Sequence, residues 1–202
     1  SVPYRLESLA AILKSGVPVL TLAPHILADI FTDISLIASL THAVPAAESL
    51  IAHMQSTLDS ARARTAHLNP SDRPLIYCEE WGKPLIHSQP WVAELVVAAG
   101  ARFLGTPAAH TTPEAIASLP EDRQPDVLLF AWCGAGNRVP LARVIAQRNW
   151  QHLRAVRNAR VHTLPDEFLN TPAHTLLEGL ASIAHAAHPT LFPPPPNLIT
   201  LT

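Results

Sequence analysis

The sequence contains few of the residues that would commit it to cross-links, a membrane span or nucleic acid. Its two cysteines, Cys78 and Cys133, form neither a disulfide framework nor a zinc-binding pattern, and we interpret them as free thiols near strand ends. No apolar run reaches the ~18 residues of a membrane span, and residues 1–4 lack the basic start of a signal peptide. The net charge is −2 without a long basic run, which argues against binding nucleic acid.

Catalytic and metal-binding motifs are also missing. The eleven histidines show no H-x-x-x-H or H-E-x-x-H spacing, so the sequence predicts no metal site. We interpret His185 and His188, three residues apart, as a surface pair. There is no G-x-S-x-G motif, and neither cysteine has a sequence-level base partner. The chain is therefore expected to bind a ligand without catalysis and without a cofactor.

From Arg73 onward, apolar runs of strand length alternate with segments of helical spacing. The strand-like runs are 75–78, 101–104, 127–132 and 161–164, and the helical segments are 90–99, 113–119, 139–147 and 172–187. Such alternation predicts an α/β fold with a mainly parallel sheet covered on both faces. We therefore expect a three-layer α/β/α lobe in this part of the chain.

The part before Arg73 is expected to be built differently. Apolar spacing predicts a helix over 4–14, a short strand over 17–22 and a second helix over 26–40. Pro45 opens a long helix that Asn69-Pro70 ends near His67, about 30 Å in length. The predicted organisation is a remnant of an N-terminal α/β lobe (1–44), a connecting helix (45–70), a C-terminal ligand-binding lobe (71–192) and an extended proline-rich tail (193–202).

An acidic and aromatic stretch follows the first strand of the predicted lobe. In an open α/β sheet, ligands bind where the carboxyl ends of the strands meet. Glu80, Trp81 and Lys83 are therefore predicted ligand contacts, and an exposed tryptophan is typical of a flat surface for a large ligand. Core packing of Trp81 remains an equal alternative. Trp91, at a predicted helix start, is interpreted as packed.

A second candidate loop runs from Trp132 to Arg138, after the third predicted strand. Gly134 allows a ligand to approach the backbone, and amides at a helix start attract negative charge. We predict ligand contacts by Trp132, Gly134, Asn137 and Arg138. Because only G-x-G is present, a dinucleotide site is a weaker alternative, in which a Rossmann-like enzyme would use the 134–138 loop.

Four stretches in order resemble one protein family: the substrate-binding proteins of ABC importers for vitamin B12, ferric siderophores and haem. The similar stretches are 80–84 with 91–95 and 98–101; 112–116 with 124–128; 166–172 with 177–180; and 188–192. The resemblance implies two α/β lobes joined by one rigid long helix. It also implies that most of the N-terminal lobe is missing, since the likeness begins at that lobe's last helix and strand.

The resemblance assigns further residues. Asp166 and Phe168, in the last ligand loop, are expected to face the ligand. Glu114 is expected to dock on arginines of a membrane permease, although Thr112 as N-cap and Pro113 at the first helical position explain an acid there equally well. The implied location is the periplasm, or a lipid anchor outside the cytoplasm.

The candidate ligands differ in charge. A ferric catecholate complex is strongly anionic, whereas the predicted loops supply only Lys83 and Arg138 as cations. A corrinoid is bulky, planar and rimmed by neutral amides, which suits aromatic faces better. We therefore predict a corrinoid (cobalamin) first, haem second and siderophores third. Besides the Rossmann-like enzyme, an interaction module that keeps the fold without a ligand is the other competing class.

Overall fold

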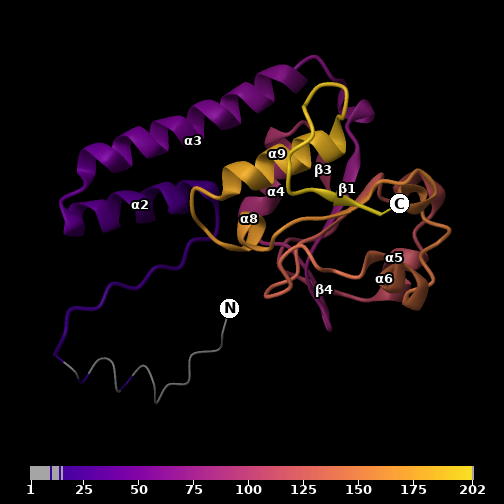
Figure 1. The fold of residues 1–202 in the computed structure, drawn as a ribbon, viewed down its shortest axis with the longest axis horizontal. Coiled ribbons are helices and arrows are strands. Elements are labelled where there is room, and N and C mark those ends of the chain that lie inside the picture. Colours follow the sequence, from indigo (N-terminus) through magenta and orange to yellow (C-terminus); the bar gives the residue numbers. More distant parts are fainter. Residues whose placement is uncertain (1–9, 11–13, 15, 202) are drawn as a thin grey trace.

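A mixed β-sheet with helices on both faces forms the body of the protein (Figure 1). The computed structural model describes Ala10, Lys14 and residues 16–201. Within these residues the strand order is β4-β2-β1-β5-β6-β7, and β3 pairs with β1. The strands are β1 (Leu75–Gly82), β2 (Leu85–His87), β3 (Arg102–Phe103), β4 (His110–Thr111), β5 (Val127–Phe130), β6 (Val161–Thr163) and β7 (Ile199–Thr200).

The centre of the sheet is parallel, as the sequence predicts. Strands β3 and β5 pair with β1 and β6 pairs with β5, all in parallel, and β1, β3, β5 and β6 correspond to the four predicted strands. Strands β2, β4 and β7 join by antiparallel pairing and were not predicted. Each of these three is only two or three residues long, too short to show a hydrophobic period.

The alternation of side chains along β1 and β5 creates two apolar layers. Ile76, Cys78 and Leu129 face one core, whereas Tyr77 and Phe130 face the other. The first core is covered by α4 (Pro90–Ala98), α8 (Glu167–Asn170) and α9 (Leu176–Ala187), and the second by α5 (Pro113–Ala117), α6 (Leu141–Gln147) and α7 (Arg154–Arg157). The expected three-layer α/β/α architecture is confirmed. Short 3-10 turns lie at Pro70–Asp72 and Glu121–Arg123.

Two helices precede the sheet and lie side by side (Figure 1). They are α2 (Leu27–Thr41) and α3 (Val44–Thr65), and the turn between them uses His42 in the left-handed conformation, at φ 59°. The 22 residues of α3 make it about 33 Å long. Leu58 and Ala61 of α3 join the core under α4 and α9. The long helix predicted over 45–67 is therefore confirmed.

Three expectations for the ends of the chain have different outcomes. The strand predicted over 17–22 is wrong, because these residues form no strand and lie away from the sheet (Figure 1). The predicted helix over 4–14 falls, apart from Ala10 and Lys14, outside the described residues. The tail is not simply extended, because β7 pairs with β6 and covers that edge of the sheet.

In the part of the chain that the structure describes, no helix is both long and apolar enough to cross a membrane.

Candidate functional site

The acidic and aromatic stretch is the end of a strand and the start of a hairpin. Strand β1 runs to Gly82 before turning into β2, and the register shifts between Glu79 and Trp81. The Trp81 side chain is 42% exposed, and its indole N–H donates to the carbonyl of Lys83 at 2.8 Å. The ring is thus held at the surface with its polar atom already bonded. A large apolar face remains open to solvent.

A hollow of about 340 Å³ lies against this ring, and we name it the tryptophan hollow. It brings together residues from the two stretches that the sequence singled out, one at the end of β1 and one after β5. Its lining is Trp81, Gly82, Lys83, Trp132, Cys133, Gly134 and Ala135. Four predicted contacts, Trp81, Lys83, Trp132 and Gly134, therefore share one hollow.

The glycine loop is held by an aspartate. The backbone N–H groups of Gly134 and Gly136 donate to the two carboxylate oxygens of Asp166, at 2.8 and 3.0 Å. Both glycines have positive φ, +77° and +57°, which aims their N–H groups at the same acceptor. The amides expected to attract a ligand are thus occupied by the protein's own carboxylate. An incoming phosphate would meet negative charge there, which disfavours the dinucleotide alternative.

The remaining residues of this loop lie outside the lining. Asn137 and Arg138 are exposed, and Arg138 Nε donates to the carbonyl of Ala135 at 3.3 Å. Asp166 is half-buried and acts on the hollow through the glycine amides. Its position supports a role in shaping the loop.

Glu80 is engaged by neighbouring side chains. Gln89 Nε2 donates to one of its oxygens at 2.6 Å, and the Cys133 thiol approaches the other at 3.7 Å. Burial, and then the Glu80 carboxylate, raise the pKa of Cys133 to about 11. This thiol is therefore protonated near neutral pH and a poor nucleophile. Both cysteines are free, and burial raises the pKa of Cys78 as well.

Two aromatic residues lie in the core under α9. Phe168 was expected to face the ligand, but it belongs to α8 and is only 9% exposed. Phe168 therefore packs against the core and does not lie in the loop that the resemblance implied. Trp91 is buried, as interpreted, and its indole N–H donates to the carbonyl of Leu169 at 2.8 Å.

A buried polar cluster behind the tryptophan hollow was not predicted. Glu79 is completely buried and accepts hydrogen bonds from Tyr77 Oη, from Trp132 Nε1 and from both terminal nitrogens of Arg148. Burial and the adjacent Glu79 carboxylate raise the pKa of Tyr77, so its hydroxyl stays a donor. Strand alternation alone would place Tyr77 and Glu79 on one face. No sequence signal links them to Arg148, 69 residues away.

A second hollow of about 500 Å³ lies beside the first, and we name it the side hollow. Gly82, Lys83 and Trp132 line both hollows. The side hollow also includes Arg148 and the exposed Glu114. Thr112 Oγ1 caps α5 by accepting from Ala115 N at 3.1 Å, so the helix-end explanation of the sequence around Glu114 is supported.

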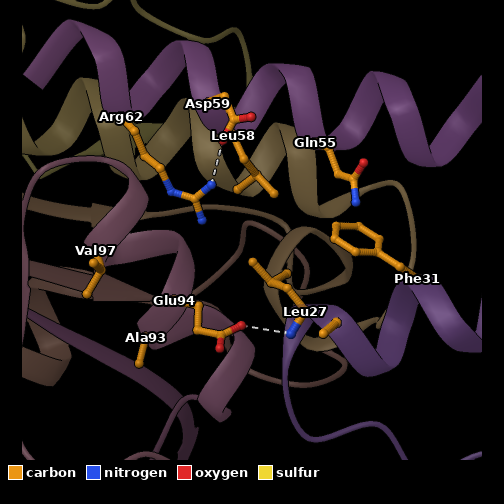
Figure 2. A pocket seen from close by; sticks show the side chains of 10 residues that line it. Leu27, Phe31, Gln55, Leu58, Asp59, Arg62, Ala93, Glu94 and Val97 are labelled. Carbon is orange, nitrogen blue, oxygen red and sulfur yellow. Dashed lines mark hydrogen bonds and ion pairs between the residues drawn. The ribbon is translucent and has the colours of Figure 1, made fainter. Parts of the chain in front are cut away.

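A third hollow, the helix hollow, lies where α2, α3 and α4 meet (Figure 2), with a volume of about 620 Å³. Leu27, Phe31 and Leu58 give it apolar walls. Its charges are engaged: Arg62 pairs with Asp59 at 2.8 Å, and Glu94 accepts from the backbone N–H of Leu27 at 2.7 Å. Its lining includes no residue of the tryptophan hollow. We interpret it as the junction that fixes α2 to the lobe.

The histidines serve separate structural contacts. His185 Nδ1 bonds to the carbonyl of Phe192 at 2.9 Å, and His188 Nε2 to the carbonyl of Gly100 at 3.1 Å. His87 is buried, and burial lowers its pKa. Among the described residues, no group of three or more His, Cys, Asp or Glu side chains could hold a metal ion.

Comparison with solved structures identifies the fold. A periplasmic haem-binding protein from Pseudomonas aeruginosa superposes with a TM-score of 0.82 at 20% identity, over 98% of this chain and 74% of that one. The haem-binding protein RhuT from Roseiflexus sp. RS-1 gives 0.75 at 20% identity, over 93% and 73%. A possible iron-binding periplasmic protein from Staphylococcus epidermidis gives 0.71 at 16% identity, over 90% and 70%. At these identities the likeness establishes the fold.

The family is established by sequence. The model of the periplasmic binding protein family matches residues 4–168, which is most of the chain. Among curated proteins, none matches significantly. The chain therefore belongs to the periplasmic binding protein family.

Proposed function

We propose that this protein captures a planar tetrapyrrole chelate and delivers it to an ABC permease. The observation that carries the proposal is that Trp81 and Trp132 line one hollow at the carboxyl ends of the parallel strands. An exposed tryptophan with a satisfied N–H offers a large, rigid apolar surface, which suits stacking on a flat macrocycle. Exposed apolar surface next to a concave site is typical of ligand binding.

Among such chelates we place haem first. Several similar solved proteins are named for haem binding. Lys83 lines the tryptophan hollow and the exposed Arg138 lies in the same loop as Gly134, so two cations are available for the two propionates of haem. This order differs from the sequence prediction, which placed a corrinoid first.

A corrinoid remains the second candidate. Lys83 is the one cation among the residues that line the tryptophan hollow, and the other polar groups of this lining are neutral. Such a lining also suits the amide rim of cobalamin. Ferric siderophores stay third, because a strongly anionic chelate calls for several converging cations.

The proposed partner is a membrane permease, and the proposed location is the periplasm or a lipid anchor outside the cytoplasm. Glu114 is exposed in the first turn of α5, where a permease arginine could reach it. Glu114→Gln is expected to slow ligand-stimulated ATP hydrolysis by the transporter and to leave ligand affinity unchanged. The exposed Asp122→Asn, in the turn after α5, is the matched control.

The test of ligand binding is a spectral titration of the purified protein with ferric haem and, in parallel, with cyanocobalamin. The wild type is expected to bind haem saturably and more tightly than cobalamin. Trp81→Ala should weaken binding roughly tenfold, about 1.4 kcal/mol, and should lower the melting temperature less than the loss of a fully buried tryptophan would, because 42% of this residue is exposed. Ile37→Ala removes a similarly exposed apolar side chain, at 44%, outside the hollow and should leave haem affinity unchanged.

Two results would contradict the proposal. One is wild-type protein that binds neither chelate. The other is Trp81→Ala protein with unaltered affinity. A nucleotide that raises the melting temperature instead would favour the Rossmann-like enzyme.

A further inference from the structure

The indole N–H of Trp132 is bonded differently from those of the other tryptophans. Trp81, Trp91 and Trp150 each donate to a backbone carbonyl. Trp132 donates instead to a completely buried carboxylate, Glu79 Oε1, at 2.7 Å. A backbone carbonyl satisfies an indole without burying a charge. The use of a carboxylate at this one tryptophan therefore needs its own explanation.

Arg148 keeps that carboxylate in place. Its two terminal nitrogens donate to the two oxygens of Glu79 at 2.8 and 2.9 Å, the bidentate geometry that guanidinium prefers. The Arg148 side chain is only 9% exposed. Its guanidinium also lies 5.8 Å from the centre of the Trp132 ring and 4.8 Å from that of Trp150. Trp132 is therefore held at its edge by Glu79 and contacted by Arg148.

The backbone of β1 confines the same ring from another side. A Cβ atom added at Gly82 would lie 2.5 Å from Cζ2 of Trp132, so only glycine leaves room for the indole. The N–H bond, the guanidinium and this glycine together leave the ring little freedom to rotate. The ring forms part of the wall of both the tryptophan hollow and the side hollow.

Stability alone is a weak reason for such a cluster. A buried ion pair costs much desolvation energy, and apolar residues of similar volume often stabilise a protein as well or better. The cluster lies directly behind a hollow, where a fixed aromatic wall reduces the entropy lost when a rigid ligand stacks on it.

We propose that Glu79 and Arg148 are positioning residues for ligand binding, which orient the Trp132 ring as a rigid wall of the tryptophan hollow. The proposal rests on the proposed function, because it assigns these residues to the site where the chelate would bind. Arg148 lines the side hollow, but neither residue lines the tryptophan hollow, so both affect that hollow through Trp132.

The test combines fluorine NMR with binding. The protein is labelled with 5-fluorotryptophan, and its four signals are assigned by single Trp→Phe variants. Glu79→Gln is expected to shift the Trp132 signal and to weaken haem binding roughly tenfold. Asp126→Asn is the matched control, because it breaks another carboxylate–arginine pair, with Arg154 at 2.8 Å, near the start of β1. The control should leave the Trp132 signal and the affinity unchanged.

A double-mutant cycle separates positioning from a general structural effect. In a Trp132→Phe background, which lacks the indole N–H, Glu79→Gln should change haem affinity by less than about twofold. If Glu79→Gln does not fold, Arg148→Lys serves instead, since it keeps the charge and loses the bidentate fork. It should shift the same signal and weaken binding.

The outcomes are distinguishable. An unmoved Trp132 signal, or equal weakening by Glu79→Gln with and without the Trp132 indole, would overturn the positioning role alone. Wild-type protein that binds neither ferric haem nor cyanocobalamin would overturn the proposed function and this inference together.

Discussion

On the α9 side of the sheet, a buried histidine forms no ion pair with any residue that the structure describes, whereas on the α6 side a buried carboxylate is paired with an arginine. His162 of β6 hydrogen-bonds through Nδ1 to Thr200 Oγ1 at 2.9 Å, and its buried Nε2 atom has no hydrogen-bond partner within the described part of the chain. Burial, followed by the nearby Arg160 and His185, lowers the pKa of His162 to about 4. Glu79, in contrast, accepts four hydrogen bonds.

The difference shows how position relates to role. A neutral histidine suits a face that only has to pack, because an uncharged ring is cheaper to bury than an ion. An ion pair with directional bonds fixes the geometry of its neighbours, and the one on the α6 side contacts Trp132 in the wall of the tryptophan hollow. The α9 side should thus determine stability, and the α6 side should determine affinity.

The largest effect is expected from the α9 side. Ile183 is completely buried in α9, so Ile183→Ala should lower the free energy of unfolding by about 4 kcal/mol through lost burial and a residual cavity. Urea denaturation measures this loss. Leu177→Ala, at a half-buried position of the same helix, should cost less. Haem affinity of the folded Ile183→Ala protein should stay at the wild-type value, and a clear decrease would break the division between the two faces.

The second effect is a dependence of stability on pH. Because the pKa of His162 is about 4 in the folded protein and 6.5 in the reference state, the unfolded chain binds the extra proton between these values. The stability from neutral His162 is therefore complete above pH 6.5 and is lost as the pH falls towards 4, by up to about 3 kcal/mol. Denaturation at several pH values should show this slope.

Substitution identifies the group responsible for that slope. His162→Gln should reduce the slope of stability against pH by up to the equivalent of one bound proton. Part of the slope should remain, because the pKa values of His87 and His188 are also lowered. Thr200→Val removes the hydrogen bond but keeps the histidine, so a slope should persist. An identical slope in the wild type and His162→Gln would contradict the assignment.

The sequence predicts the elements whose signal is local. Four parallel strands and helices α4, α5 and α6 follow from alternating apolar periods, whereas the short α7 was not predicted; Val44–Thr65 follows from Pro45 and a long helical pattern. The segment 17–22 is apolar enough to suggest a strand, but a strand exists only with a partner, which the pattern of a single segment does not reveal. The short strand β7 was not predicted, because the prolines before it indicate an extended tail, whereas it pairs with β6.

The candidate site likewise combines residues that the sequence predicts with contacts that it does not. Trp81, Lys83, Trp132 and Gly134 could be found because they lie at or just after the ends of strands, which the fold brings together. Side-chain partners could not be predicted, since they depend on contacts between distant segments. The pairing of Glu79 with Arg148 spans 69 residues, and the anchoring of the glycine loop by Asp166 spans about 30.

The smallest effect is expected from substitution of Asp166, which anchors the glycine loop beside the tryptophan hollow. Asp166→Asn keeps an oxygen that accepts from one glycine amide but loses the charge and the second acceptor, so the unfolding free energy should fall by only about 1 kcal/mol. The looser loop should let the amides of Gly134 and Gly136 exchange with solvent roughly fivefold faster, measured by NMR hydrogen exchange. Haem affinity should weaken by about threefold, because the loop forms part of the hollow.

Glu167→Gln is the matched control for this anchor, since it neutralises the exposed neighbouring carboxylate. Exchange at the two glycines and haem affinity should then match the wild type. Equal changes in both variants would mean that net charge near the hollow, and not the hydrogen bonds of Asp166, governs the loop. In that case charge near the hollow would tune affinity through long-range electrostatics, and the contrast between the α6 and α9 sides would rest on Glu79 and Arg148 alone.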